Sequence, residues 1–300
     1  MKKHNYLNNR DILKEIHKSK KTYCSFLTPD DGDYDIIVTS IAKINKKNTA
    51  DGRKLRAERL GRAAYDVAQE ASDVKLKLDD FAVNVRDIAA TDVVFRVMTY
   101  DHIPMEEPVS KKKKKLFIDE FEETEEDEDD GMDDDSPKKF AKLNFPPFQH
   151  YKVDEEGNPY LVGKSHWKGD LETGEFSKEH GDLTNKLAHM FLKICERYAS
   201  RSNWRGYTYN DEMRGQALLQ LAQIGLKFDE SKSQNPFAYY TAAITNSFTR
   251  VLNMEKRNQN LRDDILEMNN LTPSYTRQGL NSWTGSGGGS SGTYDEGGGE

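Results

Sequence analysis

The residues with the most evident chemistry lie between positions 208 and 262, where aromatic, hydrogen-bonding and cationic side chains recur close together. Cations neutralise phosphates and release counterions, and aromatic faces stack on unpaired bases. This mixture indicates a surface that binds nucleic acid. The alternative is that the aromatic side chains are core and the cations only solvate the end of a helix. The candidate DNA-binding residues are Phe237, Tyr239, Tyr240, Thr241, Asn246, Thr249, Arg250, Lys256, Arg257 and Arg262.

The sequence offers no catalytic or metal-binding pattern. It contains no nucleophile–base constellation, Walker motif or paired catalytic carboxylates, so we expect neither an enzyme nor a cofactor. His150, His166 and His180 lack the spacing of metal ligands, and Cys195 belongs to no C-x-x-C pair, so no metal site is expected. The glycines of the tail follow no strand and open no helix, which argues against a phosphate-binding loop.

Three amphipathic helices are expected to position the candidate residues. The first is predicted at Leu183–Tyr198 and the second from Asp211 to Phe228. The third follows Asn235, which can cap a helix that begins with Pro236. Apolar residues recur at helical intervals in each, so the three should pack as a bundle. The expected core residues are Leu187, Met190, Phe191, Ile194, Cys195, Tyr198, Met213, Ala217, Leu221, Ile224, Phe228, Tyr240, Ile244, Phe248, Val251 and Leu252.

Several motifs in this region resemble a known family. The segment Lys227–Phe228–Asp229–Glu230 and the later Asn235–Pro236–x–Ala238–Tyr239 resemble the second conserved region of the bacterial sigma-70 family. A closer similarity is to the late-transcription sigma factors of T-even-type phages. It is carried in order by Arg205–Gly206–Tyr207–Thr208, Glu212–Met213, Phe228–Asp229–Glu230 and Asn235–Pro236–x–Ala238–Tyr239. The opening His4–Asn5–Tyr6–Leu7–Asn8–Asn9–Arg10 with Ile12–Leu13 is also similar. The match covers roughly residues 4–18 and 182–262, about a third of the chain.

The resemblance implies a phage-encoded sigma factor in the host cytoplasm. Such a protein binds the host RNA polymerase core and directs initiation at late promoters through a short AT-rich upstream element. In sigma proteins the helix that corresponds to residues 211–227 meets a coiled coil of the largest polymerase subunits. The resemblance therefore places core polymerase-binding residues at Asp211, Glu212, Arg214, Gln216, Gln220 and Gln223. A late-transcription coactivator and a sliding clamp are further candidate partners.

The same resemblance assigns roles on the DNA side. Tyr239 aligns with the family's tyrosine of strand opening, Asn246 and Thr249 with positions that read upstream base pairs, and Arg250 with a conserved basic site. An asparagine can make paired hydrogen bonds to adenine, which suits AT-rich DNA.

The sequence departs from the family in three places. Ala242 and Ala243 stand where bacterial relatives have the tryptophans that wedge the duplex, so melting would depend on Tyr239, Tyr240 or Phe237. No second DNA-reading domain follows Arg262. The apolar-acidic peptide with which the phage family contacts the clamp is not recognisable.

The expected fold is mainly α. It has a C-terminal helical bundle like sigma region 2, a small N-terminal α or α/β accessory part, and a disordered acidic linker. The accessory part would contain a helix at Leu55–Ala71, with Leu60 and Val67 on its apolar face, and a strand at Val93–Tyr100. The expected organisation is 1–22, a helix packing on the sigma module; 23–104, the accessory region; 105–142, the linker; 143–181, an irregular, hairpin-containing aromatic and glycine segment; 182–272, the helical module; and 273–300, a flexible tail.

Charge is distributed unevenly along the 300 residues. The net charge is −7, yet Asp182–Arg262 contains twelve Lys/Arg and seven Asp/Glu. Lys111–Lys115 is a run of lysines, and Asp119–Asp135 carries thirteen acidic residues in seventeen positions. Such blocks cannot bury enough apolar surface to offset chain entropy. The lysine run is most simply a solvated linker, with a nucleic-acid-binding arm as the alternative. For the acidic run, the sharper hypothesis is mimicry of DNA in a basic channel of the partner.

Other function classes remain open from the residues alone. A structural or virion-assembly protein could use the helical module to bind only protein, and a non-specific DNA-binding accessory factor could use the cationic face without polymerase. Acidity overall argues against a protein that coats DNA. No apolar run approaches membrane-spanning length, and two cysteines make no disulfide framework.

Overall fold

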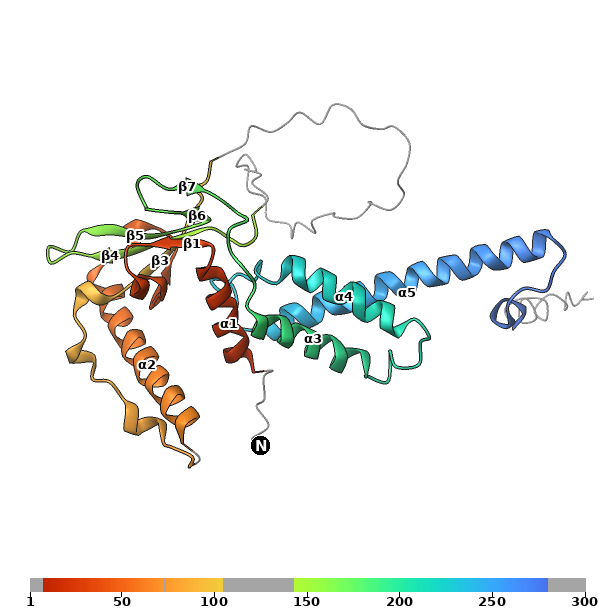
Figure 1. Cartoon of the computed structure of the whole chain (residues 1–300), viewed down its shortest axis with the longest axis horizontal. Coiled ribbons are helices and arrows are strands. Elements are labelled where there is room, and N and C mark those ends of the chain that lie inside the picture. Colours follow the sequence, from red (N-terminus) through yellow and green to blue (C-terminus); the bar gives the residue numbers. More distant parts are fainter. Residues whose placement is uncertain (1–7, 73, 105–142, 280–300) are drawn as a thin grey trace, which may run out of the picture. The chain divides into compact units, whose positions relative to one another are not determined.

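A computed structural model describes residues 8–72, 74–104 and 143–279 of the chain, shown as coloured ribbon in Figure 1. The linker expected at 105–142 and residues 280–300 of the expected tail lie outside the described residues. The chain divides into two compact units. The first comprises residues up to Met190 together with Gln223–Phe237, and the second comprises Phe191–Ala222 and the residues from Ala238 onward.

A five-stranded mixed sheet is the centre of the first unit. Its strand order is β1-β5-β4-β3-β2, in which β2 and β3 run parallel and all other neighbours antiparallel. β-Branched and aromatic residues on these strands fill a small core of Val38, Val93, Phe95, Val97 and Val153. The strands are β1 (Cys24–Phe26), β2 (Ile36–Val38), β3 (Phe95–Met98), β4 (Phe148–Val153) and β5 (Pro159–Ser165).

The sheet joins two segments that the sequence treats separately. Strands β1 to β3 come from the expected accessory region, whereas β4 and β5 come from residues 143–181. The hairpin expected in that second segment is present as β4 and β5, which pair antiparallel. Beyond β5 the segment adds a two-stranded sheet of β6 (Trp167–Lys168) and β7 (Glu175–Phe176). The N-terminal part is α/β, and its strand at β3 lies within the predicted range.

Helix α2 (Lys46–Ala71) packs on the sheet through small residues and an ion cluster. Its buried positions are Thr49, Gly52, Ala57 and Gly61. The carboxylate of Asp35 pairs with Arg59 at 2.7 Å and Arg56 at 3.2 Å. It also accepts the Val94 amide at 3.0 Å, so it fixes α2 to the strand entry.

The structure corrects the expected apolar face of α2. Leu60 and Val67 are exposed, and the helix begins nine residues before the predicted start, at a cap where the Asn45 side chain accepts from the Asn48 amide. A glycine-lined face allows the backbone to approach the sheet more closely than a leucine face would. Short 3-10 turns lie between these elements. η1 (Pro29–Gly32) precedes β2 and η2 (Ile41–Lys43) precedes α2, while η3 (Leu78–Phe81), η4 (Val85–Asp87) and η5 (Ala90–Asp92) follow α2 and lead to β3.

The predicted N-terminal helix is present as α1 (Asn9–Lys21), and Asn8 caps it. Ile12 and Ile16 are fully buried. Within the first unit α1 bonds to residues that are distant in sequence, since Glu15 accepts from Thr184 at 3.2 Å and Asn9 accepts from the Phe237 amide at 3.1 Å.

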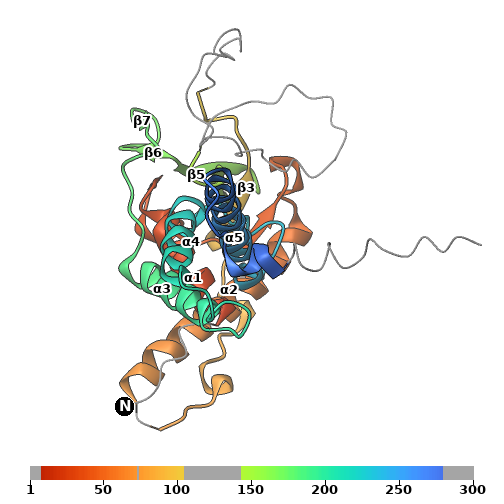
Figure 2. The same cartoon turned by 90° about the vertical axis from the view of Figure 1, so that its right-hand side faces the viewer.

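Three helices provide the second unit: the part of α3 (Asn185–Ala199) from Phe191 onward, α4 (Asn210–Ile224) to Ala222, and α5 (Pro236–Met268) from Ala238. Figures 1 and 2 show α4 lying beside α5. Phe191 packs edge-on against Tyr240, and the Tyr198 hydroxyl lies 2.6 Å from the Thr245 hydroxyl. The three predicted helices are present and most of their predicted core residues are buried, but α4 ends at Ile224 rather than Phe228, and Ile224 and Leu252 are half-buried. The chain is mainly α. Within the described residues no helix is both long and apolar enough to span a bilayer.

Candidate nucleic-acid and partner interface

Helix α5 brings four of the candidate DNA-binding side chains onto one line. Tyr239, Asn246, Arg250 and Arg257 follow one another at intervals of seven, four and seven. At 3.6 residues per turn these positions fall within about 20° of one line along the helix. All four are exposed, Tyr239 least so at 36%. Partial burial raises the pKa of the Tyr239 phenol, so it stays a neutral hydrogen-bonding ring at neutral pH.

The other candidates on α5 lie off this line. Thr249 and Lys256 are exposed about a quarter turn away, whereas Thr241 and Arg262 lie nearer the opposite side. The Thr241 hydroxyl donates to the carbonyl of Ala238 at 3.1 Å. Six of the ten candidates therefore lie off the line: these four together with Phe237 and Tyr240.

Tyr240 is expected both in the helical core and on the DNA face, and the structure places it in the core. Its side chain is completely buried and packs against Phe191, so it belongs to the helical core. The helical period forces this result, because Tyr240 stands four residues before Ile244 and eight before Phe248, both of which are fully buried. Phe237, on the first turn of α5, belongs to the first unit and is half-buried.

Helix α4 exposes a second face, with the candidate polymerase-binding residues. Glu212, Gln216 and Gln220 lie on one side of the helix, with Gln223 continuing the same row. Leu219 stands among them and is 61% exposed. The opposite side of α4 is buried through Met213, Ala217 and Leu221. A row of amides around an exposed leucine suits protein contact, and the leucine is the part that the sequence reading missed.

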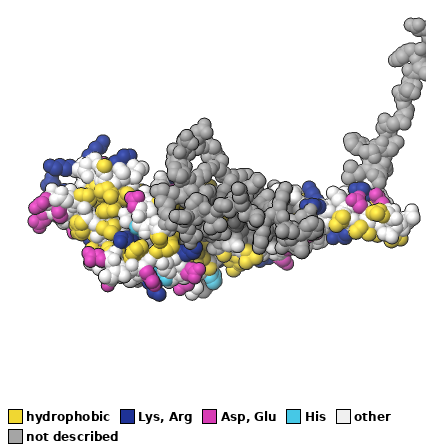
Figure 3. All heavy atoms as spheres, turned by 90° about the horizontal axis from the view of Figure 1, so that it is seen from above, with side chains coloured by type: hydrophobic (Ala, Val, Ile, Leu, Met, Phe, Trp, Pro, Cys, Tyr) yellow, Lys and Arg dark blue, Asp and Glu magenta, His cyan; other side chains and the backbone are white. Residues whose placement is uncertain are grey.

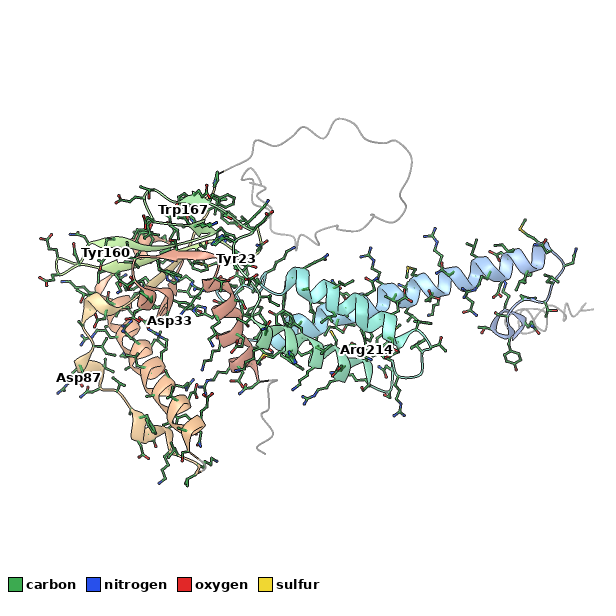
Figure 4. All side chains as sticks on the ribbon, in the orientation of Figure 1. Tyr23, Asp33, Asp87, Tyr160, Trp167 and Arg214 are labelled. Carbon is green, nitrogen blue, oxygen red and sulfur yellow. The ribbon has the colours of Figure 1, made fainter. Side chains whose placement is uncertain are left out.

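Asp211 and Arg214 lie off this row and pair with each other. The Arg214 guanidinium, labelled in Figure 4, donates to Asp211 at 2.9 Å, and it lies 3.8 Å from Glu196 of α3. Both belong to the predicted polymerase-binding set. Because Asp211 pairs with Arg214, Glu212 is the acidic candidate that lies on the exposed row of α4.

The connection between α4 and α5 is held in the first unit by buried charges. The Glu230 carboxylate accepts from Arg96 at 2.7 Å, from Lys20 at 3.1 Å and from the Tyr34 hydroxyl at 3.2 Å. Lys20 also donates to the carbonyl of Phe228 at 2.7 Å. The Arg96 guanidinium lies between the Tyr34 and Phe148 rings, 3.9 and 3.8 Å from their centroids.

Electrostatics keep this cluster ionised. Burial alone raises the pKa of Glu230, but Lys20, Arg96 and the hydrogen bonds together lower the pKa below its ordinary value. Burial lowers the pKa of Lys20, and Glu230 opposes that shift. His150 accepts from Arg96 through Nε2 at 3.0 Å, and burial followed by the Arg96 charge lowers its pKa well below the ordinary value. His150 is therefore neutral at pH 7.

The sequence reading did not foresee this role for Glu230. It assigned Phe228–Asp229–Glu230 to a family motif without a physical partner. The partners come from three distant positions, on α1, after η1 and on β3, and no local periodicity reports such contacts. The one available signal is an arginine within an apolar strand, since Arg96 interrupts the otherwise apolar run from Val93 to Met98.

The described residues contain no group of three or more His, Cys, Asp or Glu able to hold a metal ion. Comparisons of the chain with protein-family models, with curated proteins and with solved structures found no match.

Proposed function

We propose that the chain is a sigma-type initiation factor of the late-phage kind. In this proposal the helical unit is a module like sigma region 2, which binds host RNA polymerase core through α4 and contacts an AT-rich upstream promoter element through α5. The observation that carries the proposal is the line of Tyr239, Asn246, Arg250 and Arg257 along one exposed side of α5.

The chemistry of that line fits its proposed partner. Asn246 can pair with adenine in the major groove, and Arg250 and Arg257 can neutralise phosphates. Tyr239 is the aromatic residue at the start of the line, where it can stack on an unpaired base. The ordered motifs that resemble sigma factors independently point to the same helix.

In vitro transcription tests the proposal. Purified polymerase core is supplied with or without the full chain on templates that carry a TATAAATA-like upstream element. We expect initiation only when both are present. No initiation from any such template would overturn the proposal.

Two variants test the α5 line within the same assay. Tyr239→Ala should reduce open-complex formation roughly tenfold, since a stacked base contributes about 1–3 kcal/mol. Arg250→Ala should also reduce it, because a phosphate contact is lost. Lys232→Ala removes an exposed cation from the α4–α5 connection and serves as the control. Initiation that is unchanged in both α5 variants would rule out this DNA face.

Two other outcomes would identify different functions. Salt-dependent binding to bare duplex, without polymerase and without initiation, would indicate an accessory DNA-binding protein. A tight polymerase complex that leaves transcription unchanged would indicate an assembly or structural role.

A further inference from the structure

Helix α5 carries a heptad seam that continues beyond the helical core. Apolar or seam positions recur with alternating steps of four and three from Tyr240 to Met268. The first part of the seam is buried in the second unit, at Tyr240, Ile244, Ser247 and Val251. The same register continues through Met254 to Asn258, Leu261, Ile265 and Met268.

The distal part of the seam is exposed. Leu261 is 60%, Ile265 51% and Met268 84% exposed. The cause is length, because α5 has 33 residues whereas α3 and α4 have 15 each. At 1.5 Å per residue α5 is about 27 Å longer than either. Figure 3 shows hydrophobic side chains at the surface of this distal part.

The residues after α5 fold back onto a different side of the helix. The Ser274 amide and hydroxyl donate to Asp263 at 2.8 and 2.7 Å, and Arg277 donates to Asp264 at 2.8 Å. Asp263 lies on the side of the helix away from the seam. The fold-back therefore stabilises the end of α5 and leaves Leu261, Ile265 and Met268 exposed.

The residue types are those of a two-stranded coiled coil. The a positions are Val251, Asn258 and Ile265, and the d positions are Met254, Leu261 and Met268. β-Branched residues at a, unbranched or leucine side chains at d, and one asparagine at a favour two strands. We propose that the distal half of α5 pairs with the same segment of a second copy of this chain, in antiparallel orientation.

Steric considerations select the antiparallel orientation. In each copy the proximal seam is already covered by the packed α3 and α4, so a parallel pair would place two helical units side by side at the same end. An antiparallel pair places them at opposite ends. Parallel pairing would also bring Arg257 of one copy opposite Arg262 of the other, and like charges at flanking positions oppose association.

Charge complementarity selects the register. With Asn258 level with Leu261 of the second copy, Met254 lies level with Ile265. Flanking positions of the same type then face each other. Glu255 comes within about two residues of the second copy's Arg262, roughly 3 Å along the axis. Arg257 comes equally close to the second copy's Asp264, whose carboxylate also accepts from Arg277 of its own chain at 2.8 Å. Two-fold symmetry repeats both pairs. The Asn258 amide already donates to Glu255 at 3.3 Å, so it is not left without a hydrogen bond.

Sedimentation of the full chain tests the proposal. Two heptads make a small interface, so we expect a monomer–dimer equilibrium between about 1 and about 200 µM. Leu261→Glu should weaken dimerisation by about tenfold or more, because it places a charge in the seam. Asn260→Glu adds the same charge at an exposed position outside the seam and should leave dimerisation unchanged.

A charge exchange tests the register. Glu255→Arg and Arg262→Glu should each weaken the dimer about tenfold, and the double variant should restore it. The two residues are seven apart, two turns along one helix, so restoration would report contact between copies. Circular dichroism of each variant checks that the helices are intact.

Each alternative outcome overturns the proposal. A wild-type chain that stays monomeric throughout the concentration range would exclude pairing of two copies. A dimer that persists in Leu261→Glu would place the interface elsewhere. A dimer that is lost in Leu261→Glu but is not restored by the double charge exchange would exclude the antiparallel register. If the wild type is monomeric and Leu261→Glu reduces capture by polymerase core, the seam serves a helix of another protein.

Discussion

At the scale of single residues, Glu230 shows how a motif residue can act through burial. Its carboxylate is the common acceptor for Arg96, Lys20 and Tyr34. Two buried cations depend on this one negative charge. Removing one partner of a buried pair costs more than removing an exposed pair, because the remaining charge has already lost its water.

Glu230→Gln should therefore destabilise the chain by about 3–5 kcal/mol, since Arg96 and Lys20 stay buried without a counter-charge. Lys54→Met breaks the exposed Lys54–Asp51 pair on α2 and should change stability by less than about 1 kcal/mol. Urea unfolding followed by circular dichroism measures both. Similar midpoints for the two variants would show that the cluster contributes little.

Two histidines of the first unit, the buried His166 and the half-buried His102, make stability depend on pH. Burial lowers the pKa of His102 to about 4, and burial followed by the His102 charge lowers the pKa of His166 to about 3. In the unfolded chain a histidine has a pKa of about 6.5, so the unfolded state binds protons first as the pH falls. The contribution of these two histidines to the free energy of unfolding should be fully present above pH 6.5. It should be lost as the pH falls from about 6.5 to 4, by at most about 1.4 kcal/mol per pH unit for each group.

Replacing one of these histidines should flatten the pH dependence. His102→Gln should reduce the loss of stability between pH 7 and pH 5, whereas His189→Asn, at an exposed position on α3, should leave the slope unchanged. Urea unfolding at a series of pH values gives the slopes. An unaltered slope in His102→Gln would mean that His102 is protonated to the same extent in both states.

At the scale of elements, α2 and α4 show opposite uses of glycine. A Cβ at Gly52 of α2 would lie 2.5 Å from the Val93 Cγ1, so the glycine permits close packing on the sheet. A Cβ at Gly215 of α4 would meet nothing within 4 Å. Sequence patterns treat both as weak points in a helix, and only the tertiary structure separates them.

Gly52→Ala should destabilise the chain by about 1–3 kcal/mol, because the overlap with Val93 outweighs the gain in helix propensity. Gly215→Ala should stabilise it by up to about 1 kcal/mol, because only the propensity changes. Thermal unfolding measures both. Stabilisation in Gly52→Ala would mean that the sheet yields to the added methyl group at little cost.

The exposed row of α4 can be tested by charge and size. Glu212→Arg and Leu219→Glu should each lower affinity for polymerase core about tenfold, as central contacts of an interface do. Both side chains are exposed, so the fold should be unaffected. Arg197→Glu on α3 is the matched surface control. Capture of core polymerase at the wild-type level by both α4 variants would exclude this helix as the binding surface.

The sequence predicts what depends on local period and misses what depends on distant partners. The stripes of α3, α4 and proximal α5 are recognisable because each buries one helical face, as with Phe191, Met213 and Ile244. The buried side of α2 is not, because its contact residues are glycine and alanine. Joining β3 to β4 across residues 105–142 also follows no local rule, since strand pairing depends on tertiary register.

At the scale of the whole molecule, charge is segregated between the helical region and the remainder. Residues 182–262 carry a net charge of +5, from twelve Lys/Arg and seven Asp/Glu, whereas the whole chain has −7. The basic region can attract DNA locally, and the acidity of the rest of the chain limits non-specific attraction to DNA. Specific binding would then require further contacts, which polymerase would provide under the proposed function.

The isolated chain should therefore bind promoter duplex weakly and with a shallow salt dependence. Between Pro236 and Arg262 there are four Lys/Arg and one Glu, so at most about four phosphates are neutralised and the logarithmic salt slope should not exceed about 3.6. Polymerase holoenzyme that contains the chain should bind the same duplex specifically.

Deleting residues 119–135, with their thirteen acidic side chains, should raise DNA binding by the free chain, because those charges compete for the same cations. A linker of equal length in which Asp and Glu are replaced by Asn and Gln separates charge from length. Fluorescence anisotropy at several salt concentrations measures each slope and affinity. Tight binding by the unmodified free chain, or equal affinity after the deletion, would contradict this account of polymerase dependence.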